Sequence, residues 1–274
     1  MLTRILTGFS LTLFIFIPGV LFSHTPLLNI LCSIFASIGI YEIIKCFGQN
    51  NIKRLLIPSM ALGMSMPMLV RYSSFDSATF VIFALSGAYI LYIFSIPVFT
   101  DNKICFEDVS KSAVMSIYIT VGFSSIVMLR DLINGEYLFI LAFIGAWITD
   151  IFAYFTGILF GRHKLSPIIS PKKTVEGSVG GIILCTLSFA LYGFLINSIL
   201  NVSTNIYMYA VLGFFSSLVS QLGDLIMSAI KRKNNVKDYG NLFPGHGGVL
   251  DRFDSVIAVA PVIYLLCLGT MIIK

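Results

Sequence analysis

A polar segment between Ser228 and Asp254 interrupts a chain that is otherwise mostly hydrophobic. It holds three of the chain's thirteen acidic residues, five of its eighteen basic residues and one of its three histidines. Hydrophobic segments precede and follow it, and charge this dense at a membrane surface costs stability unless it binds something. We therefore look for the function of the protein first in this segment.

A second polar pattern leads into this segment from the hydrophobic residues before it. Steps of three or four residues place one set of polar side chains on a single helical face: Ser217, Ser220, Gln221, Asp224, Ser228 and Lys231. Serines alone are a common means of holding membrane helices together. That interpretation does not explain Asp224, because an ionisable group inside a membrane usually faces a cavity. We therefore predict a functional role for Asp224.

The middle of the polar segment is rich in glycine and proline, so it is not an ordinary helix. The glycines and the proline of this part are Gly240, Pro244, Gly245, Gly247 and Gly248. Such residues let backbone N–H groups approach an anion closely. Asp251 and Asp254 follow, and they share a face if a helix has begun by that point. Asp224 from one helix could meet Asp251 from the next across this loop. Two carboxylates suit Mg²⁺, which takes its other ligands from phosphate oxygens and water.

Three roles remain open for His246, which lies between glycines in the same loop. It could hold a phosphate, act as a general acid or base near neutral pH, or only support the turn. A zinc site is not indicated, because no second His or Cys stands at ligand spacing.

The other long basic connection, residues 161–177, has its own candidate anion site. Ser170 and Pro171 predict a helix start, with Ser as the N-cap and Pro as the first helical residue. Lys172 and Lys173 would then stand beside the positive end of the helix, where a phosphate could bind. The alternative is a solvated loop whose lysines only orient the protein in the membrane. That alternative does not explain the polar residues around the lysines.

Glycines four residues apart flank this connection, namely Gly157 and Gly161, then Gly177 and Gly181. Such spacing predicts close helix packing more often than ligand contact. Asp150 and Tyr154 share a face of the preceding hydrophobic segment, and Asp150 is a further candidate partner for a metal or a lysine. Glu42 lies one turn from the end of its hydrophobic segment, and we interpret it as a charge of the adjoining loop.

The elements that must position these residues are membrane-spanning helices. Hydrophobic residues make up 57% of the 274-residue chain and charged residues 11%, with a mean hydropathy of +0.93. A soluble domain carries about 25% charged residues, and a spanning helix needs about 20 apolar residues. We predict an all-α, polytopic membrane protein with about nine spans: 5–22, 26–44, 55–70, 78–98, 112–129, 137–160, 178–197, 205–228 and 255–273.

The distribution of Lys and Arg predicts how these spans are oriented, because cytoplasmic loops carry the excess of positive charge. With the N-terminus in the cytoplasm, only Arg71, Arg130 and Lys274 fall on the outer side. The other fifteen fall on the inner side: Arg4, Lys45, Lys53, Arg54, Lys103, Lys111, Arg162, Lys164, Lys172, Lys173, Lys231, Arg232, Lys233, Lys237 and Arg252. The active-site cavity is therefore expected on the cytoplasmic side.

The two halves of the chain differ in character. Residues 1–136 form about five spans joined by short, plain loops, and we expect them to be a scaffold. Residues 137–274 hold about four spans and the basic loops 161–177 and 229–254, and we expect them to be the catalytic region. We expect the first span to be retained rather than cleaved, because no clear signal-peptidase site follows it. The five cysteines are scattered without a CxxC pair, so neither a disulfide framework nor a thiolate metal site is predicted.

Together these features place two cationic loops and several carboxylates on one side of a membrane. Cations with a divalent metal fit a substrate that has several phosphates, and a site at the membrane surface fits a lipid as the second substrate. The residues alone thus predict an Mg²⁺-dependent transfer between a soluble phosphorylated donor and a lipid. A transporter of a phosphorylated anion is the alternative from another class, although the clustering of the charges on one side speaks against it.

The polar segment resembles the signature of the phosphatidate cytidylyltransferases, also called CDP-diacylglycerol synthases. The residues that carry the resemblance are Ser228, Lys231, Arg232, Lys237, Asp238, Gly240, Phe243, Pro244, His246, Gly247, Gly248, Asp251, Arg252 and Asp254. Supporting similarities are Gly223-Asp224-Leu225, the run from Ser170 to Gly177, and Trp147 with Asp150. The resemblance is specific over roughly residues 145–256, and the first half of the chain matches only in being hydrophobic.

The resemblance implies that CTP and phosphatidic acid give CDP-diacylglycerol and pyrophosphate, for phospholipid biosynthesis. It implies Mg²⁺ as the cofactor, bound by Asp224 and Asp251, and leaves a second cation such as K⁺ open. It also implies a homodimer, in contact with membrane lipid, that passes several times through the cytoplasmic (inner) membrane of a bacterium. No nucleic-acid partner is expected. The alternative within enzymes is a nucleotidyl or phosphoryl transferase that acts on another lipid phosphate.

Carried over by position, the resemblance divides the site residues into two groups. The expected catalytic group is Asp224, Asp251, Lys231, Lys237, Asp238 and His246. The expected substrate-binding group is Asp150, Lys172, Lys173, Glu176, Ser228, Arg232, Arg252 and Asp254. The phosphates would be neutralised by Lys231, Arg232, Lys237 and Arg252. The individual roles of the other residues in the polar segment are left open, including that of His246.

Overall fold

The computed structural model describes residues 17–48, 52–72, 75–100, 104–200, 202 and 204–270 of the chain. The chain divides into two compact units. Unit 1 comprises Met1–Met128 and Asn234–Phe253, and unit 2 comprises Leu129–Lys233 and Asp254–Lys274. The expected functional division into residues 1–136 and 137–274 stays a prediction.

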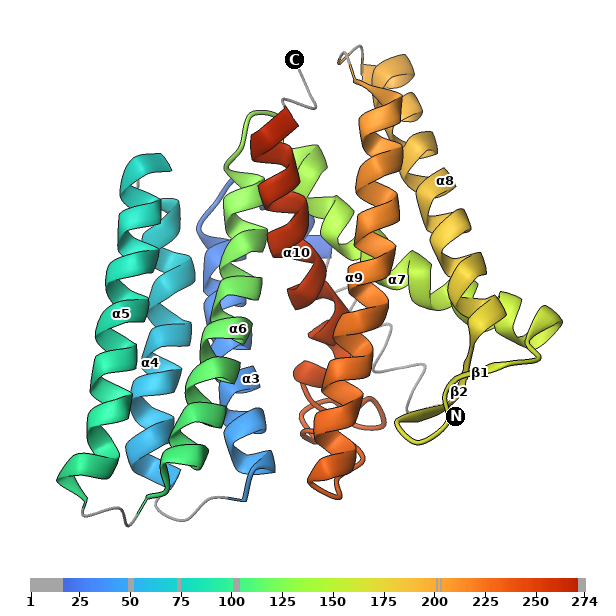
Figure 1. Ribbon diagram of the computed structural model, residues 1–274. Helices are drawn as coiled ribbons and strands as arrows, with labels where there is room; N and C mark the ends of the chain where they lie inside the picture. The colour runs from blue at the N-terminus through green and yellow to red at the C-terminus, as the bar shows by residue number, and fades with distance from the viewer. Residues whose placement is uncertain are drawn as a thin grey trace. The chain divides into compact units, whose positions relative to one another are not determined.

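The long hydrophobic segments form helices, as their composition predicts (Figure 1). The first half of the chain forms α2 (Ile17–Leu21), α3 (Leu27–Cys46), α4 (Ile52–Arg71), α5 (Phe75–Phe99) and α6 (Phe106–Arg130). The second half forms α7 (Gly135–Phe160), β1 (Lys164–Ser166), β2 (Ser170–Thr174), α8 (Val175–Leu200), α9 (Ile206–Lys233) and α10 (Leu250–Thr270). Several helices extend beyond the predicted spans: α6 begins at Phe106, before the predicted start at residue 112, and α9 continues through Lys231 and Arg232.

Seven helices in the described part of the chain are long and apolar enough to cross a membrane. They are α3, α6, α7, α8, α9, the part of α5 from Phe80 to Phe99 and the part of α10 from Leu250 to Gly269. The third predicted span corresponds to α4, which is not among the seven and contains Pro58 and Pro67. Most of the first predicted span lies outside the described residues. The multi-pass helical architecture is confirmed, whereas the count of nine, the orientation and the side of the cavity stay predictions.

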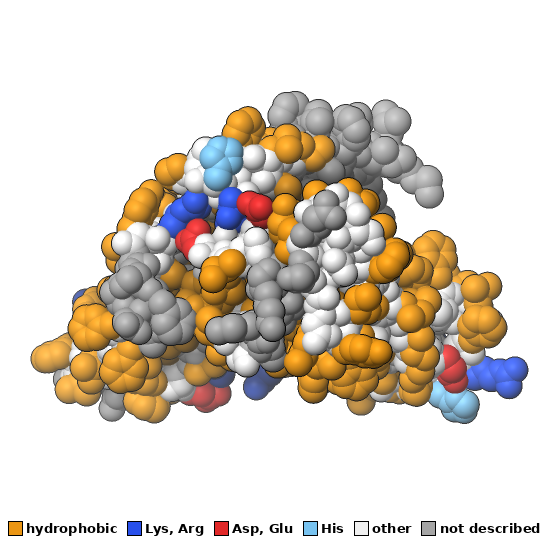
Figure 2. All heavy atoms as spheres, turned by 90° about the horizontal axis from the view of Figure 1, so that it is seen from above, with side chains coloured by type: hydrophobic (Ala, Val, Ile, Leu, Met, Phe, Trp, Pro, Cys, Tyr) orange, Lys and Arg blue, Asp and Glu red, His pale blue; other side chains and the backbone are white. Residues whose placement is uncertain are grey.

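The outer surface of the chain fits this architecture. Figure 2 shows hydrophobic side chains over most of the visible face, with charged side chains gathered in small groups. Large apolar side chains are exposed along the spans, such as Phe83 and Leu91 on α5 and Leu159 on α7. Exposed apolar surface of this extent would be a liability in water, and it is the expected surface of helices that contact lipid.

Unit 1 has a core formed by helices α3 to α6. Buried aliphatic side chains of α4, α5 and α6 pack into one hydrophobic cluster that includes Leu62 and Ile93. Within this core the hydroxyls of Ser59 and Tyr89 lie 2.7 Å apart and form a hydrogen bond. Helix α3, which carries a buried acid, packs beside α4 in the same unit.

Unit 2 is built on close contacts between α7 and α8, and α9 packs beside α8. A side-chain Cβ added at Gly177 would lie 3.1 Å from the Cα of Gly157, and one at Gly181 would lie 3.1 Å from the Cβ of Ala153. Added carbons at these distances would push the helices apart, so the glycines permit the close approach. The predicted helix-packing role is confirmed for Gly157, Gly177 and Gly181, whereas Gly161 lies just beyond the end of α7.

The connection between α7 and α8 corrects one sequence-based prediction. The expected helix start at Ser170 and Pro171 is wrong, because both residues lie in β2, which pairs antiparallel with β1. Apart from this short two-stranded hairpin, the described elements are helices, in agreement with the predicted all-α class. A two-stranded sheet has only edge strands, so it tolerates a proline. The helix begins at Val175 instead, and the Thr174 hydroxyl caps it by accepting a hydrogen bond from the Gly177 backbone N–H at 3.1 Å.

Candidate functional site

The predicted site residues of unit 2 gather around Asp224 on α9. One carboxylate oxygen of Asp224 forms an ion pair with the Lys173 ammonium, which comes from β2. The other oxygen accepts a hydrogen bond from the Ser228 hydroxyl one turn along α9, at 3.4 Å. Both partners of the ion pair are about a quarter exposed, at 24% for Lys173 and 21% for Asp224. Both side chains are therefore accessible to solvent.

Two further carboxylates lie near Asp224. Asp150 on α7 interacts electrostatically with Asp224 and with Lys173. Asp254 on α10 interacts with Asp224, with Asp150 and with Lys231. We call Asp150, Asp224 and Asp254 the carboxylate cluster. Its three acids lie within electrostatic range of one another and of Lys173 and Lys231.

The hairpin that carries Lys173 is also joined to the end of α9. The Arg232 side chain donates from Nε to the backbone oxygen of Ile169, at 3.5 Å, in the turn between β1 and β2. Lys172 is exposed on β2, beside Lys173. Four of the predicted cations (Lys172, Lys173, Lys231 and Arg232) thus come from two elements that contact each other within unit 2. This arrangement could hold an anionic substrate against α9.

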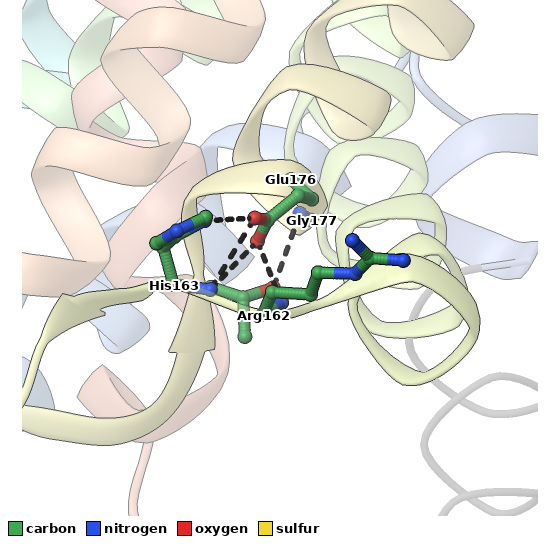
Figure 3. A network of polar contacts seen from close by, with 5 residues as sticks. Arg162, His163, Glu176 and Gly177 are labelled. Atoms are coloured by element: carbon green, nitrogen blue, oxygen red, sulfur yellow. Dashed lines mark hydrogen bonds and ion pairs between the residues drawn. The ribbon is translucent and has the colours of Figure 1, made fainter.

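Glu176 holds the base of this hairpin (Figure 3). Its carboxylate accepts a hydrogen bond from the Arg162 backbone N–H at 3.0 Å and from the His163 backbone N–H at 3.2 Å. The imidazole Nδ1 of His163 lies 2.6 Å from the other carboxylate oxygen. These contacts fasten the end of α7 to the first turn of α8. Glu176 was predicted to bind substrate, and in the structure its carboxylate engages the protein's own backbone.

We expect the Glu176→Gln substitution to loosen the hairpin. A glutamine side chain has one acceptor oxygen, so it cannot accept hydrogen bonds from both the two backbone N–H groups, which share one carboxylate oxygen, and the His163 imidazole, which contacts the other. Loss of one hydrogen bond should make local opening of the hairpin several-fold more frequent. Trypsin should therefore cleave after Lys164 and Lys172 several-fold faster than in the parent protein. The matched control is Glu107→Gln, which changes an exposed acid on α6. Equal cleavage rates in the parent and Glu176→Gln proteins would contradict this role.

The polar face of α9 continues from Asp224 into the interior of unit 2. Ser217 and Ser220 are fully buried, and Gln221 is nearly so. Gln221 is bonded to α8 twice, because its carbonyl accepts the Ser178 hydroxyl and its amide donates to the Ser178 backbone oxygen at 3.2 Å. The predicted polar face of α9 is therefore buried and hydrogen-bonded to α8 in this part. These contacts position Asp224, which lies at the end of the buried part.

The predicted residues of unit 1 line a pocket in the loop between α9 and α10. The pocket has a volume of about 400 Å³ and is lined by Lys237, Asp238, Asn241, Phe243, Pro244, Gly245, His246, Gly247 and Arg252. Gly245 and Gly247 adopt left-handed backbone conformations, with φ of 78° and 85°, which favour glycine. The Arg252 side chain donates from Nε to the backbone oxygen of His246, at 2.8 Å. Two cations and a histidine therefore converge on one cavity.

Asp251 organises this loop from within. Its Oδ2 atom accepts hydrogen bonds from the backbone N–H groups of Tyr239, at 2.8 Å, and Gly248, at 2.9 Å. The loop's N–H groups were expected to approach an anion, and at these two positions the anion is the protein's own carboxylate. Because α10 begins at Leu250, Asp251 and Asp254 are both helical, which meets the condition set for their sharing a face.

Glu42 on α3 is a residue whose importance the sequence did not reveal. The interpretation as a loop charge is wrong, because its side chain is only 3% exposed and it accepts backbone hydrogen bonds from Val249 and Leu250. The partners are 207 and 208 residues away along the chain, so no local spacing connects them. The available signal was an acid inside an otherwise apolar span, which is a reason to expect a buried partner.

Asp224 belongs to unit 2 and Asp251 to unit 1, so their joint binding of a metal stays a prediction. Among the described residues, no group of three or more His, Cys, Asp or Glu side chains is arranged to hold a metal ion. The donor set nevertheless suits Mg²⁺ in chemical type, because Mg²⁺ is bound by one or two carboxylates together with phosphate oxygens and water. The carboxylate cluster supplies such oxygens.

Comparison with known proteins gives a match over nearly the whole chain. Residues 2–269 match the model of the cytidylyltransferase family. The phosphatidate cytidylyltransferase of Staphylococcus epidermidis is 34% identical over 275 residues, covering 98% of this chain and 100% of the relative. The protein of the same name from Staphylococcus haemolyticus is 34% identical, covering 97% and 98%. That from Staphylococcus aureus is 33% identical, covering 97% and 98%.

Proposed function

This chain belongs to the cytidylyltransferase family, and we propose that it transfers the cytidylyl group of CTP to phosphatidate, giving CDP-diacylglycerol and pyrophosphate. The observation that carries this function is the similarity over nearly the full length to relatives named phosphatidate cytidylyltransferase. The groups of basic and acidic residues in the two units suit this chemistry, because nucleotidyl transfer depends mainly on positioning and charge neutralisation.

The reaction we propose is a direct displacement. An anionic phosphate oxygen of phosphatidate attacks the α-phosphorus of CTP and forms a new P–O bond. The bond between the α-phosphorus and the bridging oxygen breaks, and its electron pair leaves with pyrophosphate. A phosphate nucleophile is already charged, so the protein needs no covalent intermediate and no strong base.

The cations of the protein would neutralise the phosphates in this reaction. Lys237 and Arg252 line the pocket of unit 1, and Lys231 and Arg232 end α9 in unit 2. Lys173, which is paired with Asp224, could exchange that partner for a phosphate oxygen. Fixed cations of this kind stabilise charge as it develops on the departing pyrophosphate without reorganising.

We propose Mg²⁺ as the cofactor, with Asp224 and Asp251 as its protein ligands. When bound, the ion would offset the charge of the triphosphate and of the leaving pyrophosphate. Asp224 is suited to this role because it is partly exposed and has Asp150 and Asp254 in electrostatic range. A second cation such as K⁺ would find further carboxylate oxygens in the same cluster.

We also propose a homodimer in the cytoplasmic membrane of a bacterium. The seven apolar helices support a multi-pass membrane protein, and the matched relatives named above are bacterial. Phosphatidate would then reach the protein from the surrounding bilayer, whereas CTP would arrive from the cytoplasm. The site is expected on the cytoplasmic side, where the positive-inside rule places both basic loops.

The proposed activity is tested with purified protein, CTP labelled in the α-phosphate and a panel of lipid phosphates. Phosphatidate should become labelled as CDP-diacylglycerol, while polyprenyl phosphate and lysophosphatidate should give far less labelled lipid. Preferential labelling of another lipid phosphate would show that this other lipid, and not phosphatidate, is the substrate. Uptake of label into proteoliposomes without any labelled lipid would instead favour a transporter.

A further inference from the structure

Each carboxylate oxygen of Glu42 accepts a hydrogen bond from one of two successive backbone N–H groups at the start of α10. Its Oε1 atom accepts the Val249 N–H at 3.0 Å, and its Oε2 atom accepts the Leu250 N–H at 2.9 Å. The first N–H groups of a helix have no partner within the helix, and a carboxylate there is stabilising. Here the carboxylate comes from another helix, so it ties α3 to the beginning of α10.

The same carboxylate explains two of the loop's glycines. A Cβ added at Gly240 would have the Glu42 side chain as its three nearest neighbours, and the same is true of a Cβ added at Gly248. Neither glycine has a left-handed φ, in contrast to Gly245 and Gly247. Space for Glu42, rather than an unusual backbone conformation, is therefore what requires glycine at these two positions.

The loop is thus held by two carboxylates that accept different backbone N–H groups. Asp251 accepts the N–H groups of Tyr239 and Gly248, and Glu42 accepts those of Val249 and Leu250. These four groups lie at the two ends of the segment that forms the pocket. The pocket itself is lined by other residues of the loop, and Glu42 is not among them.

We propose that Glu42 is a positioning residue for the proposed cytidylyl transfer. Its carboxylate fixes the backbone of the loop between α9 and α10, and thereby holds Lys237, His246 and Arg252 in place around the pocket. Glu42 does this from the buried side of the loop, without touching substrate. The kinetic part of this proposal rests on the proposed function, whereas the structural part does not.

The Glu42→Gln substitution is the sharpest single test, because it preserves size while removing one acceptor. The two backbone donors bond to different oxygens, and a glutamine has only one carbonyl oxygen. Glu107→Gln, the same chemical change at an exposed position of α6, is the matched control. Both proteins should elute as the parent does in size-exclusion chromatography.

The first measurement is hydrogen–deuterium exchange of the loop in the full-length protein without substrate. At least one of the amides of Val249 and Leu250 should exchange about tenfold or more faster in Glu42→Gln than in the parent, the change expected for loss of a charge-assisted hydrogen bond. The Glu107→Gln control should exchange as the parent does at these amides. Unchanged exchange in Glu42→Gln would overturn the proposal, whatever the enzyme's activity.

The second measurement separates positioning from general stability through the substrate dependence. Glu42→Gln should raise KM for CTP by about tenfold, because the phosphate-binding cations are displaced. We place the triphosphate of CTP, rather than phosphatidate, in this pocket, so KM for phosphatidate should change less than about twofold. A fall in kcat with both KM values unchanged would contradict a positioning role in CTP binding. If the parent protein does not use CTP at all, the proposed function fails, and the exchange experiment still decides the structural claim.

A double-mutant cycle tests the contact between Glu42 and Gly240 directly. Gly240→Ala should lower kcat/KM for CTP by about tenfold or more when Glu42 is present, because the added methyl group collides with its carboxylate. With Glu42→Ala the collision is gone, so adding Gly240→Ala should cost little more. The two substitutions should therefore be strongly non-additive. Additive effects would contradict direct contact between Glu42 and this glycine as the cause.

Discussion

Replacing Asp224 by Asn is expected to lower kcat for pyrophosphate release by about a thousandfold or more while the protein stays folded. Asparagine has nearly the same shape and can still accept the Ser228 hydroxyl, so packing in unit 2 should be preserved. What disappears is the negative charge that pairs with Lys173 and that would hold the proposed metal. The substitution therefore tests the effect of the charge on turnover without changing the fold.

The measurement is the initial rate at saturating CTP and phosphatidate, over a range of Mg²⁺ concentrations. Asp108→Asn is the control, because it changes a partly exposed acid at the start of α6 in the same way. Thermal unfolding and elution volume should match the parent for both variants. Near-parental, Mg²⁺-dependent turnover by the Asp224→Asn protein would remove Asp224 from the metal site.

Replacing Asp251 by Asn is expected to cause a similar loss of turnover, again about a thousandfold, together with a second effect. Asp251 accepts two backbone N–H groups of the loop as well as serving as a proposed metal ligand. Charge-assisted hydrogen bonds are stronger than neutral ones, so the neutral amide should hold Tyr239 and Gly248 less firmly. Amide exchange at these two residues should become several-fold faster.

The two aspartates can be told apart by this second effect. In Asp224→Asn the amides of Tyr239 and Gly248 should exchange at the parental rate, because Asp224 is bonded to Lys173 and Ser228 instead. In Asp251→Asn the loss of turnover and the faster exchange should occur together. Fully active Asp251→Asn protein would exclude Asp251 as a ligand, and unchanged exchange would exclude its role in the loop.

Helix positions were predictable because hydropathy is a local property of the sequence. Each long helix from α3 to α10 overlaps a predicted span, and the ends differ by a few residues where polar side chains extend a helix beyond the apolar stretch. Lys231 and Arg232 illustrate this, since charged residues continue α9 instead of beginning the loop. The polar face that leads to Asp224 was predictable for the same reason, because helical spacing alone defines it.

The start of α8 was not predictable by the same rules. Ser170 and Pro171 have the types of an N-cap and a first helical residue, yet they form the second strand of a hairpin. The contacts that decide the outcome are tertiary, namely the bonds from Glu176 to Arg162 and His163 and the ion pair from Lys173 to Asp224. A cap pattern five residues upstream cannot compete with these contacts, and Thr174 takes the capping role.

Glu42 shows the limit of reading function from a motif. The motif itself includes Gly240 and Gly248, and their spacing pointed to a loop that binds an anion. The structure shows that the anion nearest to both is a carboxylate from α3, which the motif does not include. Sequence spacing identifies residues that act together within one segment, whereas a partner from another helix becomes visible only when the chain is folded.

The most direct test of the central claim is pyrophosphate release by the purified full-length protein, measured with phosphatidate and Mg²⁺ supplied separately and together. We predict release from CTP only when both are present, with an equal amount of CDP-diacylglycerol formed and with loss of activity on chelation. Release without phosphatidate, or the absence of release when CTP, phosphatidate and Mg²⁺ are all present, would contradict the account.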